Sequence, residues 1–410
     1  MRIAFKTFGC RLNRAEALEE EARLGAAGHA IVPLDADPAP DCIVVRGCSV
    51  TAKAAHESEK EVARLRARFP AAEIRRAGCL PGAARDAPPP PDAPVPRATS
   101  RAYLKVQDGC SGRCAFCIVP QFRGAPASVP FAHVLARARA FLVAGYRELV
   151  VTGCNLALYR DAGRRLPDLV AALAALDGPA PYRLRLSSLE PGLCGADLLD
   201  ALAAHPNVCR FLHLSLQSAS DRVLRRMNRP YAREDVAAFC DAALRRLGPR
   251  LALGADVIAG FPGETDADHA ATLDFLARPL PSEPAAAFSL LHVFPFSERP
   301  GTAAAALDGA LPHAVRRARA QELAALGRRL RAAYARSFVG RTVEVCVERG
   351  GLFGRTAEYL PCRLAAPAPR RALVAARVAA CEAAGTLVAR PSAPAARGSP
   401  EARSRADARS

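Results

Sequence analysis

Short hydrophobic runs alternate with longer amphipathic stretches along most of this chain. A short apolar run predicts a buried strand, and apolar positions that recur every three or four residues predict a helix. Near the start of the chain, the runs at 3–5 and 42–45 predict strands, and residues 15–27 and 51–69 predict helices. This alternation indicates a small α/β domain over residues 1–83.

The same alternation recurs between residues 99 and 335. Helical stretches, as at 131–144 and 233–247, separate six candidate strands. The candidate strands are 103–106, 148–152, 182–186, 211–216, 251–258 and 286–293. Strands that alternate with helices pair in parallel, so we predict a partial (β/α)6 barrel here. The fold class is therefore α/β.

The pattern changes towards the C-terminal end. The stretch 313–338 has a helical pattern with seven arginines and one acidic residue, Glu322. Such a helix is either a solvated connecting helix or a surface that follows phosphates. Beyond it, the stretches 342–348, 354–359 and 372–378 predict the strands of a further small domain.

Two compositional breaks help to divide the chain into domains. A four-proline run within residues 84–98 predicts a semi-rigid linker. The last residues are rich in Ser, Arg, Ala and Pro, which predicts disorder. We expect an N-terminal domain at 1–97 that ends in the linker, a central domain at 98–336, a small β domain at 337–392 and a disordered tail at 393–410.

The composition favours a cytoplasmic protein that binds metal. The chain has 410 residues, of which 14 are cysteines, and it contains no run of 18 apolar residues. Its first residues lead directly into a predicted strand, so we expect neither a signal peptide nor a membrane span. Cysteines in a large cytoplasmic chain stay reduced and often bind metals.

The charge balance is strongly basic. With 57 Lys and Arg against 40 Asp and Glu, the formal net charge is +17. Such a charge favours a polyanionic partner, because neutralised phosphates release counterions on binding. Arg greatly outnumbers Lys and Ala is abundant, as a GC-rich genome would also produce, so the charge alone leaves nucleic-acid binding open.

Three closely spaced cysteines carry the strongest chemical signal. Cys110, Cys114 and Cys117, here called the central trio, have the spacing C-x3-C-x2-C. Three cysteines can ligate three irons of a 4Fe–4S cluster and leave the fourth iron open to a small molecule. The alternative is a structural zinc site with a distant fourth ligand, but such sites usually show two paired ligand clusters.

Three further cysteines each follow a predicted strand. Cys10, Cys48 and Cys79, here called the N-terminal trio, should gather at the edge where parallel strands end. On spacing alone, three separated cysteines are more often ordinary buried thiols. The residues around them decide between these two interpretations.

Those residues resemble the radical S-adenosylmethionine (SAM) enzymes. An aromatic residue, Phe116, before the third cysteine of the central trio is typical of that superfamily. The wider motifs resemble the methylthiotransferases over residues 1 to about 392, and most closely the MtaB-like branch that modifies threonylcarbamoyladenosine in tRNA. These motifs lie at 7–13, 47–51, 78–79, 185–191, 213–218, 226–231, 256–265 and 292–297.

The resemblance implies SAM and two 4Fe–4S clusters as cofactors. The central trio would hold the cluster whose open iron binds SAM, which is cleaved to methionine and a 5′-deoxyadenosyl radical. The N-terminal trio would hold a second cluster, from which the inserted sulfur comes. Both assignments of cysteines are expectations from the resemblance.

Six strand-end side chains should face the barrel mouth and contact SAM. Each also has a structural alternative: a glutamate before a proline can cap a turn, and a histidine can be a satisfied core residue. The six are Asn155, Glu190, Gln217, Asp256, Glu264 and His292.

The resemblance also implies partners and a reaction. A TRAM-like barrel at 337–392 would bind tRNA, and an electron donor such as flavodoxin or ferredoxin would reduce the cluster. The expected enzyme converts N6-threonylcarbamoyladenosine next to the anticodon into its 2-methylthio derivative. A buried threonyl carboxylate needs a cationic partner, and Arg123 and Arg229 are the candidates.

Three alternatives stay open at this point. In the first two, an enzyme with the same radical chemistry acts on a different substrate, either isopentenyladenosine in tRNA or an aspartate of a ribosomal protein. A non-catalytic RNA-binding iron–sulfur protein is the alternative outside enzymes. Four positions also depart from the family pattern without removing a cysteine of either trio: Arg46, Val129, Cys154 and Ala219. Of these, Arg46 changes the charge beside the N-terminal trio.

Overall fold

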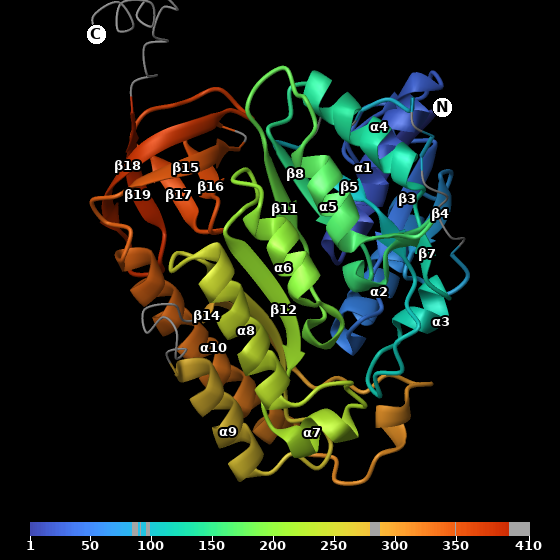
Figure 1. The fold of residues 1–410 in the computed structure, drawn as a ribbon. Coiled ribbons are helices and arrows are strands. Elements are labelled where there is room, and N and C mark those ends of the chain that lie inside the picture. Colours follow the sequence, from blue (N-terminus) through green and yellow to red (C-terminus); the bar gives the residue numbers. More distant parts are fainter. Residues whose placement is uncertain (84–88, 91, 96–98, 279–287, 349, 393–410) are drawn as a thin grey trace, which may run out of the picture.

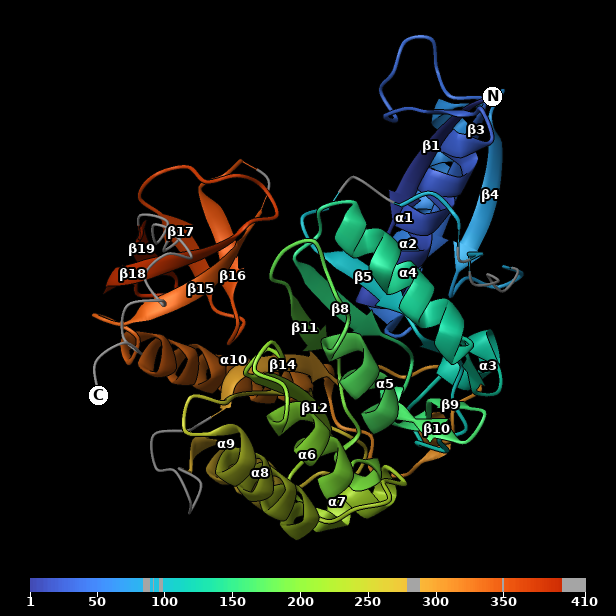
Figure 2. The ribbon, with the colours of Figure 1, turned by 45° about the horizontal axis from the view of Figure 1, so that its top comes forward.

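The computed structural model describes residues 1–83, 89–90, 92–95, 99–278, 288–348 and 350–392. Figure 1 and Figure 2 show an N-terminal domain and a C-terminal barrel that flank a larger central domain. Most of the predicted linker and all of the predicted tail lie outside the described residues. The domain boundaries therefore stay predictions.

The N-terminal domain is a four-stranded parallel sheet with the order β2-β1-β3-β4. Its strands are β1 (Arg2–Thr7), β2 (Ala30–Ile31), β3 (Cys42–Gly47) and β4 (Glu73–Gly78), and its helices are α1 (Arg11–Ala26) and α2 (Ala52–Arg68). Strand β3 is buried on both faces, because Ile43 packs with Leu65 of α2 and Val44 packs with Leu24 of α1. Successive residues of a strand point to opposite faces, which explains why β3 is a continuous apolar run.

Six parallel strands form the central domain. They are β5 (Ala102–Lys105), β8 (Glu148–Thr152), β11 (Arg183–Leu186), β12 (Phe211–Gln217), β13 (Ala252–Ala259) and β14 (Phe288–Pro295). They form two three-stranded sheets, with the orders β11-β8-β5 and β12-β13-β14. Two isolated bridges, Leu184–Val208 and Leu189–Leu214, lie between the neighbouring segments of these sheets. Each predicted strand matches one of these strands, although residues 286–287 of the last prediction lie outside the described part of the chain.

Helices cover the outer side of these strands (Figure 1). They are α4 (Phe131–Val143), α5 (Leu166–Ala174), α6 (Ala196–Ala203), α8 (Arg233–Leu247) and α9 (Asp266–Ala277), and two short helices, α3 (Val119–Arg123) and α7 (Asp221–Arg226), lie in the segments that follow β6 and β12. Short strands β6 (Gln107–Asp108) and β7 (Ala127–Ser128) form an antiparallel pair that encloses the intervening loop and α3, and β9 (Arg160–Asp161) with β10 (Arg164–Arg165) forms a small hairpin. The main hydrophobic core lies between the parallel strands and the helices, and the α/β prediction is confirmed.

A long helix, α10 (His313–Arg336), packs along β14 and leads into the C-terminal barrel. The barrel is closed in the order β15-β16-β17-β19-β18. Its strands are β15 (Thr342–Val347), β16 (Phe353–Thr356), β17 (Pro361–Leu364), β18 (Leu373–Cys381) and β19 (Leu387–Pro391). The predicted strand 354–359 is too long: β16 ends at Thr356, and Tyr359 has a positive φ of 68° that belongs to a turn. None of the described helices is long and apolar enough to cross a membrane.

Candidate functional site

The N-terminal trio lies at one edge of its sheet, as predicted from the strand order. Cys10, Cys48 and Cys79 follow β1, β3 and β4. The amide nitrogen of Cys79 donates to the carbonyl oxygen of Gly47 at 3.1 Å. A Cβ on Gly9, whose φ is +92°, would lie 2.7 Å from the Cβ of Cys48. The loop that carries Cys10 therefore passes directly against Cys48.

Asn13, which is fully buried in the first turn of α1, fixes these loops. Its Nδ2 donates to the carbonyl oxygens of Phe8 at 3.0 Å and Gly47 at 2.7 Å. Its Oδ1 accepts a hydrogen bond from Nη2 of Arg123 at 2.8 Å. Asn13 thus connects two loops of the trio to the central domain.

Arg123 extends from the end of α3 into the N-terminal trio. Its Nε donates to Sγ of Cys79 at 3.2 Å, and its Nη1 lies 2.8 Å from Oε1 of Glu16. Asp108 also accepts from this guanidinium at 3.1 Å. Burial raises the pKa of Cys79, and the charge of Arg123 limits that rise. This arginine already has two carboxylate partners, which weakens its predicted role as the partner of a substrate carboxylate.

Arg46 does not leave an uncompensated charge beside the trio. Its Nη2 lies 2.7 Å from Oε2 of Glu20, and its Nη1 lies 3.4 Å from Oε2 of Glu16. Lys105 from β5 lies 2.6 Å from Glu16 as well. The positive charge that Arg46 brings to this position is therefore balanced by acidic residues of α1.

The central trio occupies the loop that follows β5 and β6. The amide nitrogen of Cys117 donates to the carbonyl oxygen of Cys114 at 3.0 Å. Nη1 of Arg229 donates to Sγ of Cys114 at 3.0 Å. Burial raises the pKa of Cys117 to about 11, so at neutral pH a metal that binds this thiol displaces its proton.

A cavity of about 350 Å³, here called the cluster cavity, opens beside the central trio. Cys110 and Cys114 line it together with two of the predicted SAM contacts, Asn155 and Glu190. Glu190 forms an ion pair with Arg229, which lines the same cavity. Burial raises the pKa of Glu190, and Arg229 opposes that rise. Like Arg123, Arg229 therefore already pairs with a carboxylate.

A second cavity of about 230 Å³, here called the interdomain cavity, lies between the N-terminal and central domains. Val50 and Thr51, just beyond Cys48, line one side, and Gln217 and Asp256 line another. Cys117 of the central trio also reaches this cavity. The interdomain cavity therefore touches the segments that carry both trios.

Comparison with known proteins identifies the family. The model of the Radical SAM superfamily matches residues 104–276, and that of the Uncharacterized protein family UPF0004 matches residues 2–87. A tRNA-2-methylthio-N(6)-dimethylallyladenosine synthase of Cereibacter sphaeroides is 34% identical, over 85% of this chain and 88% of that protein. The chain belongs to the radical SAM methylthiotransferases.

A second group of relatives carries a different name. The Threonylcarbamoyladenosine tRNA methylthiotransferase MtaB of Chlamydia pneumoniae is 32% identical to this methylthiotransferase, over 83% of this chain and 85% of that protein. The protein of the same name from Thermotoga maritima is 30% identical, over 84% and 86%. The predicted family and enzyme class are confirmed, and with them SAM and two 4Fe–4S clusters as cofactors.

Solved structures support the fold of the methylthiotransferase. The radical SAM methyltransferase TsrM from Kitasatospora setae, with cobalamin and a [4Fe-4S] cluster bound, matches with a TM-score of 0.52 at 15% identity. The match covers 72% of this chain and 76% of that chain. At this identity the likeness concerns the fold alone.

Two predicted SAM contacts lie outside both cavities. Glu264 accepts a hydrogen bond from the amide nitrogen of Gly260 at 3.0 Å and another from Nη1 of Arg319 at 2.8 Å. Burial raises the pKa of Glu264 in spite of these donors. His292 is not among the lining residues of either cavity, but its Nδ1 lies 3.3 Å from Oδ1 of Asp256.

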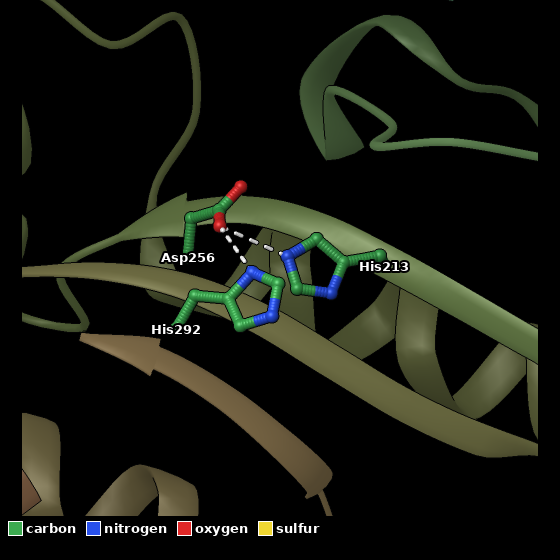
Figure 3. A group of neighbouring side chains, drawn as sticks. All are labelled: His213, Asp256 and His292. Carbon is green, nitrogen blue, oxygen red and sulfur yellow. Dashed lines mark ion pairs between the residues drawn. The ribbon is translucent and has the colours of Figure 1, made fainter. Parts of the chain in front are cut away.

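Asp256 lies between two histidines (Figure 3). Nε2 of His213 is 3.0 Å from the Oδ1 of Asp256 that also faces His292. Burial raises the pKa of Asp256, but the two imidazoles outweigh burial and bring it below the ordinary value. This carboxylate is therefore ionised at neutral pH.

Sequence reasoning missed several residues of the site. Ser297 accepts a hydrogen bond from the amide nitrogen of Ala52 at 2.8 Å and lines the interdomain cavity. Phe294 and Phe296 line it as well. These residues belong to a motif that was recognised, 292–297, but no pattern in the sequence shows that it faces the start of α2.

Proposed function

We propose that this methylthiotransferase converts N6-threonylcarbamoyladenosine in tRNA, next to the anticodon, into its 2-methylthio derivative. The observation that carries the proposal is the interdomain cavity, which Cys117 of the central trio lines together with Val50 and Thr51, just beyond Cys48 of the N-terminal trio. A base held there would be near the source of the radical and near the source of the sulfur. The two relatives named MtaB support the choice of this nucleoside.

We assign the two clusters to the two trios. The soft thiolates of the central trio suit iron, and the adjoining cluster cavity has room and polar groups for SAM. Bound SAM supplies the radical, which the reaction needs because the C2–H of adenosine is unreactive toward polar chemistry. Arg229 and Arg123 each donate to one cysteine sulfur, at Cys114 and Cys79, and stabilise these sulfurs as anions.

Polar side chains of the interdomain cavity support the threonylcarbamoyl group as substrate. Thr51, Gln217, Asp256 and Ser297 offer hydrogen-bonding groups to a carbamoyl or hydroxyl group. An isopentenyl group has no polar atoms and would leave such groups without partners, which lowers affinity.

Isopentenyladenosine is the second candidate substrate. Val50, Phe116, Ile258 and Phe294 give the same cavity an apolar side. A relative named for dimethylallyladenosine is 34% identical to this chain, against 32% and 30% for the two relatives named MtaB. The two candidates therefore differ in which side of the cavity holds the N6 substituent.

The test is a direct competition between substrates. The reconstituted enzyme is incubated with SAM, a reductant such as reduced flavodoxin or ferredoxin, and an equal mixture of the two modified tRNAs. Nucleoside mass spectrometry then measures the products. We expect the methylthio product of threonylcarbamoyladenosine alone, and a preference for isopentenyl tRNA would overturn the substrate assignment while leaving the radical chemistry intact.

A further inference from the structure

Three side chains with ligating atoms converge inside the central domain, from β12, β13 and β14. Figure 3 shows His213, Asp256 and His292 pointing toward one another. Among the described residues, they are the one group of three His, Cys, Asp or Glu side chains that could hold a single metal ion. Their ligand atoms all lie within 4.8 Å of one another.

The geometry at His213 suits a shared ion better than a hydrogen bond. This residue is 1% exposed, and neither ring nitrogen makes a hydrogen bond with the described residues. Its Nε2 is nevertheless only 3.0 Å from Oδ1 of Asp256, close enough for the two atoms to share one ion. Two ligands of one zinc ion, each at about 2.1 Å, lie about 3.4 Å apart in tetrahedral geometry.

The backbone makes room for this imidazole. A Cβ on Gly254 of β13 would lie 2.4 Å from Nδ1 of His213. The ring of Phe211 lies against the same glycine, since its Cζ would be 3.0 Å from that Cβ, and the ring centroids of Phe211 and His213 are 6.0 Å apart. The ring of His213 is therefore held in place before any ion binds.

The group is accessible from the interdomain cavity. Asp256 lines that cavity, and the side chain of His292 is 42% exposed. An ion held by three protein ligands keeps at least one coordination position open, as in catalytic zinc sites. Through Asp256, an ion held here would border the cavity in which a substrate would lie.

We propose that His213, Asp256 and His292 bind one divalent transition-metal ion of the zinc class, in addition to the two clusters. Two imidazoles and one carboxylate are the donor set that this class prefers, whereas Mg²⁺ and Ca²⁺ prefer oxygen ligands alone. The ion accepts an anionic oxygen ligand from the cavity. In a step that rests on the proposed function, this ligand is the threonyl carboxylate, because Arg123 and Arg229 are already paired with Glu16 and Glu190.

Metal content tests the site without any substrate. The holoenzyme, with its iron content measured, is dialysed against zinc under anaerobic conditions, and retained zinc is counted. We expect one zinc per chain in the wild type. Asp256→Asn and His292→Ala should each bind zinc more weakly, by more than the tenfold to hundredfold loss of metal affinity that removal of an outer-shell partner causes. His313→Ala, at an exposed position on α10, is the matched control and should retain zinc.

Unchanged iron content in the two variants shows that they fold and keep their clusters. The metal site is overturned if the wild type retains no more zinc than His292→Ala. This outcome is independent of which nucleoside the enzyme accepts.

The carboxylate step has its own readout. Binding of tRNA with threonylcarbamoyladenosine is compared with binding of the unmodified tRNA, for the zinc-loaded wild type and for His292→Ala. We expect the preference for the modified tRNA to fall about tenfold or more in the variant. Equal preference in both proteins overturns this step, whereas absence of any preference in the wild type overturns the proposed function itself.

Discussion

At the scale of single residues, Tyr359 has a phenol whose pKa is lowered from its ordinary value. Its hydroxyl oxygen accepts from Nη2 of Arg11 at 3.0 Å, and its ring stacks on Phe211 with centroids 4.9 Å apart. Arg355 and Arg101 also lie near the ring. Burial raises the pKa of this phenol, but the arginines outweigh burial and lower it to about 8.

Replacing Tyr359 by Phe should change how stability depends on pH. The pKa of about 8 in the folded protein lies below the ordinary tyrosine pKa of 10, so the phenolate stabilises the folded state at high pH, and this contribution disappears as pH falls through 8. The difference in unfolding free energy between wild type and Tyr359→Phe should grow by on the order of 2 kcal/mol from pH 7 to pH 10. Denaturant unfolding at several pH values measures it.

Tyr334→Phe is the control for this prediction. The hydroxyl of Tyr334 donates to the carbonyl oxygen of Arg250 at 2.8 Å, and burial raises its pKa. Its contribution to stability should therefore not grow between pH 7 and pH 10. Parallel pH curves for wild type and Tyr359→Phe would contradict the assignment.

The two cysteine trios should have separable roles. Cys48→Ala should lose about four irons and still cleave SAM, but it should form no methylthio product, because its sulfur-donating cluster is missing. Cys114→Ala should lose about four irons and do neither reaction. Cys381→Ala, a partly exposed cysteine of the C-terminal barrel, is the control. Iron analysis and chromatography of 5′-deoxyadenosine decide it, and product formation by Cys48→Ala would refute the assignment.

Single residues were predictable from the sequence only where local spacing carries the information. The central trio followed from its spacing, whereas the N-terminal trio was singled out by the family resemblance of the residues around it, because spacing alone favoured ordinary buried thiols. The partners of Arg123 did not, because Glu16 is distant in sequence and no local pattern connects the two. The same holds for Glu264, whose partner Arg319 comes from α10.

At the scale of elements, α10 carries both buried and exposed arginines. Arg319 is buried and pairs with Glu264 at 2.8 Å and with Asp266 at 2.5 Å. Arg328 and Arg329 are exposed. The count of arginines predicted a basic helix correctly, but only the packing of α10 along β14 decides which arginines are available to phosphates.

These two kinds of arginine should respond differently to substitution. Arg319→Ala leaves Glu264 buried without its partner and should lower the unfolding free energy by about 3 kcal/mol. Arg328→Ala with Arg329→Ala should change stability by less than about 1 kcal/mol, but should weaken tRNA binding and reduce its salt slope by about 2. Unfolding and filter binding at several salt concentrations measure both, and an unchanged salt slope would exclude these arginines from the RNA surface.

At the scale of the whole molecule, the C-terminal barrel completes the central domain. Nη2 of Arg183 donates to the carbonyl oxygen of Arg355 at 2.7 Å, and Nη2 of Arg185 donates to that of Thr356 at 2.9 Å. Both arginines also pair with the fully buried Glu148. The sequence predicted the parallel strands and the presence of the barrel, but not this contact, because its acceptors are backbone carbonyls that no side-chain pattern marks.

A chain that ends at Arg336 should therefore be less stable as well as unable to bind tRNA tightly. Removing the barrel takes hydrogen-bond acceptors from two buried guanidinium groups, which is costly. A chain that ends at Ser392 keeps these acceptors and is the control. Thermal unfolding compares the two, and an equal Tm for both chains would show that the central domain is stable on its own.

The contact between Arg123 and Cys79 also determines when the surroundings of the N-terminal trio are complete during biosynthesis. A ribosome releases the three cysteines of the N-terminal trio before it releases α3, which carries the guanidinium that touches one of their sulfurs. Tyr359, the partner of Arg11 beside Cys10, emerges later still. The surroundings of this trio are complete only when nearly the whole chain has been made, so a cluster held by this trio would gain its full set of neighbours only after translation.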